Sequence, residues 1–267
     1  MMIRKTFAWA LLAGLASFAV SAQTADELIA KSIEARGGKD KLTAVKSLRM
    51  TGKMALPQGM EAPFTAELAR PNKMRRDFTI QGMTGSMAFD GTSGWSLMPF
   101  LGKTEPEPMS GDDLKALEDE ADFDGVLFDY KEKGHQVELV GKEDVDGSPA
   151  YKLKVTKKNG DVEYHYLDAE QYLEVKVEGK QKMRGQEVEG VSKLGNYKEV
   201  GGLIFPFSIE TTQKGAPGSL VITIDKVEIN PDLPASRFDM PKIEKPAASP
   251  APAAPPSPPT PPAPPQR

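Results

Sequence analysis

The 267-residue chain contains no cysteine and only two histidines. The absence of cysteine excludes disulfide bonds, thiolate metal sites and a lipid-modified N-terminus, which needs a cysteine at the cleavage point. His135 and His165 lie on different predicted strands without a second ligand at a metal-binding spacing, so no metal site is expected. The 34 basic and 38 acidic residues nearly balance. No basic block indicates nucleic acid as a partner.

Enzyme motifs are also lacking. Ser93 stands in Gly-Thr-Ser-Gly-Trp rather than in a Gly-x-Ser-x-Gly elbow, and no glycine-rich loop precedes a helix to hold phosphate. The acidic run over residues 112–124 lacks the spacing of a calcium loop and is typical of a solvated helix face. We therefore expect no catalytic residues and no cofactor, and the chain is predicted not to be an enzyme.

The two ends differ in composition from the middle. Residues 1–22 combine Arg4 and Lys5 with an apolar run of 14 residues, too short to span a bilayer, and small residues before a cleavage point after Ala22. This pattern predicts a cleaved signal peptide, with an uncleaved N-terminal tether as the alternative, and an exported periplasmic or extracellular protein. Of the 23 prolines, 11 fall in the last 22 residues. Residues 244–267 are therefore predicted to be a disordered tail, either a solubilising end or a semi-rigid spacer, which leaves a single domain over 23–243.

Hydrophobic periodicity in this domain predicts a mainly β, α+β fold. Helices are expected over 25–36, 39–46 and 110–123, with Ser110 and Asp113 suited to a capping box. Elsewhere apolar residues alternate with polar ones, which indicates about ten or eleven antiparallel strands, and Pro206 favours a sheet edge or a bulge. A sheet this long must curl or close, and the helices can cover its dry face. The dry positions of the first strands are Met50, Met54, Phe64, Leu68, Met74 and Phe78.

The segment 89–100, Phe-Asp-Gly-Thr-Ser-Gly-Trp-Ser-Leu-Met-Pro-Phe, contains Trp95, the one tryptophan outside the predicted signal. Asp90-Gly91 signals a hairpin, with Met87 and Phe89 on one face of the first strand and Trp95 and Leu97 on one face of the second. The residues alone leave open whether Trp95 is a core residue or a cavity wall. Eight of the twelve methionines fall between residues 50 and 109, which suits either a core or an adaptable groove.

Three short motifs occur in order along the chain. They are Arg70-Pro71-Asn72 at a strand end, Asp90-Gly91 followed by Trp95 and Pro99-Phe100, and Phe238 with Pro241 near the C-terminus. Together with the signal peptide and the strand number, they resemble the LolA/LolB-like periplasmic lipoprotein carriers and outer-membrane lipoprotein-sorting proteins. The resemblance implies an incomplete antiparallel β-barrel whose concave apolar face is covered by helices that act as a lid.

That resemblance also implies a function and a site. The expected function is a periplasmic carrier, a monomer that binds acyl chains of lipoproteins or other lipids for transport toward the outer membrane, with membrane-bound donor and acceptor proteins as candidate partners. The alternative is an envelope sensor on the same fold that binds lipid or peptide and signals through a partner. Arg70 is expected to latch the lid through backbone carbonyls or a carboxylate. The expected cavity wall is Met50, Met54, Phe64, Leu68, Met74, Phe78, Met87, Phe89, Trp95 and Leu97.

His165 has a conspicuous setting on its predicted strand. It lies between Tyr164 and Tyr166 and therefore points to the opposite face from both tyrosines. We expect that face to be the solvated one.

Overall fold

The computed structural model describes residues 23–57, 59–183 and 185–242. The predicted signal peptide and proline-rich tail lie outside these residues. Within these ranges there are three α-helices, α1 (Ala25–Ala35), α2 (Lys39–Ala44) and α3 (Gly111–Glu120), and two short 3-10 helices, η1 (Pro99–Leu101) and η2 (Ala235–Arg237). All three α-helices were predicted at these places. No helix of the described residues is both long and apolar enough to cross a membrane.

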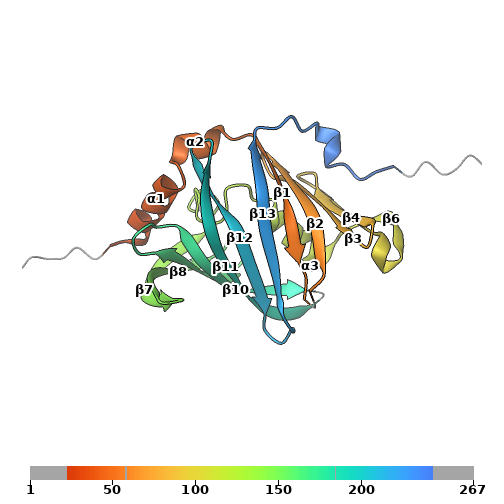
Figure 1. Cartoon of the computed structure of the whole chain (residues 1–267). Helices are drawn as coiled ribbons and strands as arrows, with labels where there is room; N and C mark the ends of the chain where they lie inside the picture. Colours follow the sequence, from red (N-terminus) through yellow and green to blue (C-terminus); the bar gives the residue numbers. More distant parts are fainter. Residues whose placement is uncertain (1–22, 58, 184, 243–267) are drawn as a thin grey trace, which may run out of the picture.

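In the part of the chain that the structure describes, thirteen strands form one antiparallel sheet in the order β6-β5-β4-β3-β2-β1-β13-β12-β11-β10-β9-β8-β7. The sheet does not close, so the fold is the predicted incomplete barrel, seen as a strongly curved sheet in Figure 1. The strands are β1 (Ser47–Ala55), β2 (Glu61–Ala69), β3 (Lys73–Ile80), β4 (Met83–Phe89), β5 (Gly94–Met98), β6 (Lys103–Pro108), β7 (Gln136–Val145), β8 (Ser148–Thr156), β9 (Val162–Asp168), β10 (Glu174–Met183), β11 (Gln186–Val200), β12 (Leu203–Gln213) and β13 (Ser219–Ile229).

The strand number exceeds the ten or eleven expected from the sequence. One strand that alternation could not reveal is β6, because its sequence Lys-Thr-Glu-Pro-Glu-Pro is polar and carries Pro106 and Pro108. Proline removes a ladder donor and is tolerated at a sheet edge, which is where β6 lies. Pro206 behaves similarly within β12. Residues 203–207 pair with β11 alone, and pairing with β13 begins at Ser208, so Pro206 faces a locally free edge.

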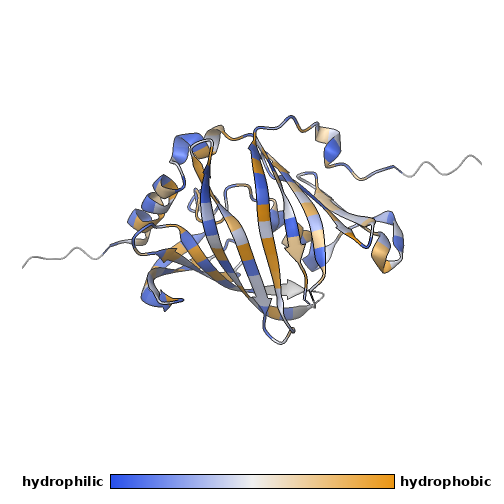
Figure 2. Cartoon of the chain, viewed as in Figure 1, coloured by the Kyte–Doolittle hydropathy of each residue, from blue (hydrophilic) through white to orange (hydrophobic). Residues whose placement is uncertain are grey.

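The pairing registers define two faces of the sheet. Met50, Ala66, Arg76 and Met87 are direct partners across β1 to β4 and share one face, here called the inner face. Arg49, Glu67, Arg75 and Trp95 lie in the alternating row on the outer face. Figure 2 shows the corresponding bands of polar and apolar residues along the strands.

Helix α3 covers the inner face of the N-terminal strands. Its Leu117 is 3% exposed and packs with Met74 and Phe89 of β3 and β4. A Cβ atom on Gly94 of β5 would lie 3.0 Å from a Leu117 methyl carbon, so glycine permits the close approach. Ser110 is the N-cap residue as predicted, but its side chain makes no capping hydrogen bond, so the predicted capping box does not form.

Helices α1 and α2 cover the inner face elsewhere. In α1, a capping box between Thr24 and Glu27 fixes the first turn, and Leu28 and Ile29 are buried against β8 and β9. In α2, Leu42 packs into the cluster with Leu203 and Phe207 where β12 diverges from β13. The three helices thus fill different parts of the concavity, and the 121–135 loop connects α3 to β7.

Candidate functional site

A cavity of about 460 Å³ lies between the sheet and the layer formed by α1 and the 121–135 loop. Its floor comes from β9 to β12 and its cover from one face of α1 and from the loop. Apolar side chains dominate the lining, and they include Ile29, Ile33, Phe123, Val126, Leu127, Leu194, Ile204, Phe205 and Ile209. The volume falls within the roughly 300–1,000 Å³ of small-molecule sites.

The cover of this cavity is joined to the sheet by Arg70. The Arg70 guanidinium donates from Nη1 and Nη2 to the two carboxylate oxygens of Asp124, at 2.7 Å each. It also donates from Nε to the Val45 carbonyl at 2.7 Å and from Nη2 to the Leu42 carbonyl at 3.1 Å. The hydrogen bonds to Asp124 raise the pKa of Arg70, and its charge lies 4.6 Å from the centre of the Phe123 ring. Both kinds of partner expected for Arg70, carbonyls and a carboxylate, are present.

These contacts connect three parts of the chain. Arg70 follows β2, the two carbonyls belong to the C-terminal end of α2, and Asp124 and Phe123 line the cavity from the loop. Side-chain exposures of 28% for Arg70 and 14% for Asp124 mean that solvent screens the pair only in part. A latch for the cover is therefore chemically available at Arg70.

The floor of the cavity contains a buried charged chain. His165 is 5% exposed and lies between the carboxylates of Glu163, at 3.3 Å from Nε2, and Glu174, which contacts Nδ1. Burial lowers the pKa of His165, but the two carboxylates outweigh it and raise the pKa to about 9. Glu163 also pairs with Lys157 at 2.5 Å. An imidazolium held between two carboxylates thus forms part of an otherwise apolar floor.

The expectation that His165 faces solvent is wrong. His165 does point away from Tyr164 and Tyr166, as the alternation requires, but the tyrosines are on the outer face. There, Lys152 lies 4.8 Å from the Tyr164 ring centre and Lys176 lies 3.9 Å from that of Tyr166. Tyr166 is 1% exposed in a cluster with Val145 and Ala150, and Tyr164 is partly exposed, so β9 is covered on both faces here.

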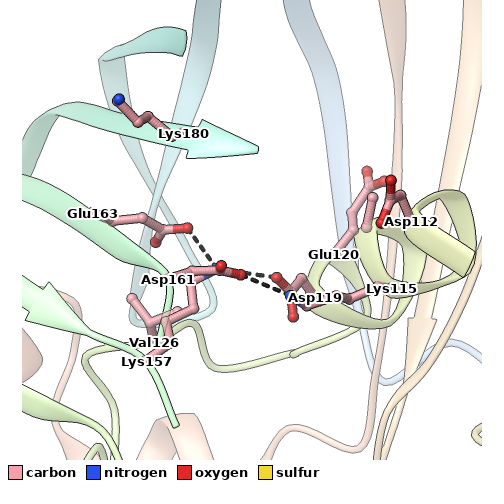
Figure 3. Close-up of a pocket in the computed structure, with 10 residues that line it drawn as sticks. Asp112, Lys115, Asp119, Glu120, Val126, Lys157, Asp161, Glu163 and Lys180 are labelled. Carbon is pink, nitrogen blue, oxygen red and sulfur yellow. Dashed lines mark hydrogen bonds and ion pairs between the residues drawn. The ribbon is translucent and has the colours of Figure 1, made fainter. Parts of the chain in front are cut away.

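A second, polar hollow of about 380 Å³ lies between α3 on one side and the β8–β9 turn, β9 and β10 on the other (Figure 3). Ion pairs cross it: Lys115 of α3 binds Asp161 at 2.9 Å, and Lys157 of the β8–β9 turn binds Asp119 of α3 at 3.0 Å. In Figure 3, Glu163 and Asp161 face α3 across this hollow. Helix α3 is thus packed on the N-terminal strands through apolar contacts and joined to the C-terminal strands through charges.

The inner-face arginine Arg76 lies beneath α3. Its guanidinium pairs with Glu120, and burial lowers its pKa. Among the described residues, no group of three or more histidine, aspartate or glutamate side chains is placed to hold a metal ion.

Eight of the ten residues expected to line the cavity lie on the inner face. Met54 and Phe64 are buried in the cluster beneath α2, with Met50 and Phe78 packed against it. The other four belong to the cluster beneath α3: Met74, Phe89, Leu68 and Met87. None of the eight lines the cavity over β9 to β12, because α2 and α3 fill the concavity above them.

The prediction that Trp95 and Leu97 form part of the cavity wall is wrong, because both residues lie on the outer face of the sheet. Trp95 pairs with Ala88 and Leu97 with Ser86, both in the outer row of β4. Trp95 is 2% exposed, its Nε1 donates to the Phe238 carbonyl at 2.9 Å, and Arg75 lies 5.4 Å from the centre of its ring. Trp95 therefore anchors the C-terminal segment to the outer face, through a hydrogen bond to Phe238 of the third motif.

The C-terminal segment is held there by charges as well. Arg237 of η2 binds Glu67 at 2.6 Å and Asp77 at 2.9 Å, while Arg75 donates to the Arg237 carbonyl at 3.0 Å. Phe238 is fully buried. The second and third sequence motifs thus meet in one structural anchor on the side of the sheet opposite to the cavity.

Sequence reasoning missed the residues that line the cavity. They come from α1, the 121–135 loop and β9 to β12, where no motif of the resemblance falls. One signal in the sequence could have indicated this region. It is His165, which alternates with Tyr164 and Tyr166, because a polar residue on a dry face needs charged partners.

The comparisons with known proteins agree with this architecture. No protein-family model matches the chain, and no curated protein matches its sequence. Among solved structures, a LolA superfamily protein from Nitrosomonas europaea is similar with a TM-score of 0.54 and 16% identity, over 82% of this chain and 98% of that one. A putative outer membrane lipoprotein-sorting protein domain from Vibrio parahaemolyticus gives 0.52 and 15%, over 79% and 94%.

A third similar structure is a DUF1329 family protein from Desulfovibrio piger. Its TM-score is 0.55 at 12% identity, over 80% of this chain and 96% of that one. At these identities the likeness concerns the fold. The chain therefore has the incomplete-barrel fold of LolA superfamily proteins, as its three motifs predicted.

Proposed function

We propose that this protein binds acyl chains of lipoproteins or other lipids in the cavity over β9 to β12 and carries them through the periplasm toward the outer membrane. The observation that supports this most is a mainly apolar cavity beneath a cover whose loop is bound by Arg70 through Asp124. In this proposal residues 1–22 direct export, residues 23–243 form the binding domain, and binding involves no covalent chemistry.

The energetics suit a reversible carrier. Burial of each methylene contributes about 0.8 kcal/mol, so one ~16-carbon chain gains on the order of 10 kcal/mol before the opposing terms. Those terms are the ordering of the chain and the opening of the cover, which breaks the two hydrogen bonds between Arg70 and Asp124. Opposing terms of similar size allow cargo to be released as well as bound.

Native mass spectrometry of the protein purified from its own envelope tests the proposal. A co-purifying amphiphile at one per protein is the expected result, and a protein that is always empty would contradict it. The site itself is tested by Ile209→Glu, which puts a carboxylate into the cavity lining and should abolish the bound species. Val140→Glu is the matched control, because Val140 is 53% exposed on β7 and lies outside the lining.

A further inference from the structure

Arg36 is the charged residue of the cavity lining without an oppositely charged partner among the described residues. The lining also contains three carboxylates, and each has a cation: Asp122 has Lys133 at 2.7 Å, Asp124 has Arg70, and Glu174 has His165. Arg36 makes one side-chain hydrogen bond, from Nη1 to the Asp124 carbonyl at 3.3 Å.

The position of Arg36 is fixed by its backbone. It is the C-cap residue of α1, and its carbonyl accepts a hydrogen bond from the Ile204 amide of β12 at 3.0 Å. The side chain therefore starts where the cover meets the sheet. Its charge reaches Tyr197, since burial raises the pKa of the Tyr197 hydroxyl and Arg36 acts in the opposite direction.

An arginine has five N–H donors in a planar fork that matches carboxylate and phosphate oxygens. With one of them used by a carbonyl, Arg36 offers the rest to a ligand that enters the cavity, where the three carboxylates already have cations. A neutral lipid head would leave this guanidinium charge uncompensated, whereas an anionic head would neutralise it.

We infer that Arg36 binds the anionic head group, a carboxylate or a phosphate, of a lipid whose acyl chain fills the cavity. This inference rests on the proposed function and narrows its cargo to anionic amphiphiles. A role for Arg36 in helix α1 alone, through its place at the C-terminal end, would affect stability and would not distinguish head groups.

The test compares probes that share a chain and differ in the head. The full protein is titrated with cis-parinaric acid and with its methyl ester, followed by probe fluorescence. Palmitoyl lysophosphatidate and monopalmitoylglycerol serve as competitors that distinguish phosphate from carboxylate. We expect the acid to bind about tenfold or more tightly than the ester, the size of a charge-assisted hydrogen bond. A larger anion preference between the two competitors than between the acid and the ester identifies a phosphate head group, and the reverse identifies a carboxylate.

Variants then assign the preference to Arg36. Arg36→Met should weaken the acid to the level of the ester without changing the ester, and Arg36→Lys should keep part of the preference. Lys41→Met removes the same charge from an exposed position outside the lining and should leave the ratio unchanged.

The outcomes separate the two proposals. Equal binding of acid and ester by the unaltered protein overturns the inference and leaves the carrier proposal standing, as does an equal loss of both probes in Arg36→Met. Failure of both probes to bind the unaltered protein overturns both.

Discussion

Asp124→Asn is the substitution that most directly tests whether Arg70 controls the cover. It preserves the shape of the side chain and leaves the Arg70 hydrogen bonds to the Val45 and Leu42 carbonyls in place. The substitution removes the negative charge of Asp124, which accepts two hydrogen bonds of 2.7 Å from Arg70. The Asp124 side chain is 14% exposed, so solvent screens this charge only in part. The 121–135 loop should then open more often while α2 stays attached.

The size of the effect follows from the partly buried geometry. Hydrogen bonds to charged groups contribute about 1.5–3 kcal/mol to stability, and exposed ion pairs contribute about 0–1 kcal/mol. Because the Arg70–Asp124 pair is partly buried, we expect it to hold the loop closed by about 2 kcal/mol. A loss of about 1.4 kcal/mol corresponds to a tenfold change in an equilibrium constant. Amide hydrogen exchange of residues 122–128 should accelerate more than tenfold, and a fluorescent fatty acid should transfer faster to acceptor vesicles.

Asp129→Asn provides the matched control in the same loop. Asp129 pairs with Lys39, but the two side chains are 36% and 57% exposed, so its loss should change neither exchange nor transfer measurably. If Asp124→Asn left both rates at the level of the control, Arg70 would be a structural residue and the latch would be refuted.

Three further expectations concern stability and Trp95. Folding raises the pKa of His165 from 6.5 to about 9, so the protonated imidazole stabilises the folded state. This contribution is complete below about pH 6.5 and is lost as the pH rises through 9. Urea unfolding should show a decrease of about 3 kcal/mol between pH 6 and pH 10, and His165→Gln should flatten this profile. In protein lacking residues 1–22, and therefore Trp9, the emission of Trp95 should not respond to an acyl ligand. Phe238→Ala should shift this emission to longer wavelength and reduce the free energy of unfolding by about 3–5 kcal/mol. Gly37→Ala should destabilise by more than about 1 kcal/mol in urea, because Gly37 has φ of 119° and a Cβ would lie 2.4 Å from the Gly202 carbonyl oxygen.

The face of a residue could be predicted within a strand but not across a hairpin. Met50, Met54, Phe64 and Leu68 share the inner face because side chains alternate with a period of two. The turn after Phe89 makes Gly94 its partner, which puts Trp95 one residue out of step and on the outer face. A loop longer than two residues does not specify this register, so the error followed from the turn and not from the strands.

The position of the cavity was beyond sequence reasoning for a different reason. Alternation identified a dry face but not how much of it the helices fill. Helices α2 and α3 bury Leu42 and Leu117 against the N-terminal strands, and the space that remains lies under α1 and the loop. The partners of Arg70 could be predicted because the Arg70-Pro71-Asn72 motif carried the resemblance that implied carbonyl or carboxylate contacts.

The anchoring of Phe238 and Arg237 has a practical consequence. These residues hold the chain on the outer face of β2 to β5, and Figure 1 shows this segment running away from α1. A fluorophore, affinity tag or surface attachment introduced after residue 242 would therefore start on the side of the sheet opposite to the cavity. The molecule offers a natural point of immobilisation for single-molecule or surface-based measurements of lipid exchange, in which the attachment lies away from the α1 side of the sheet.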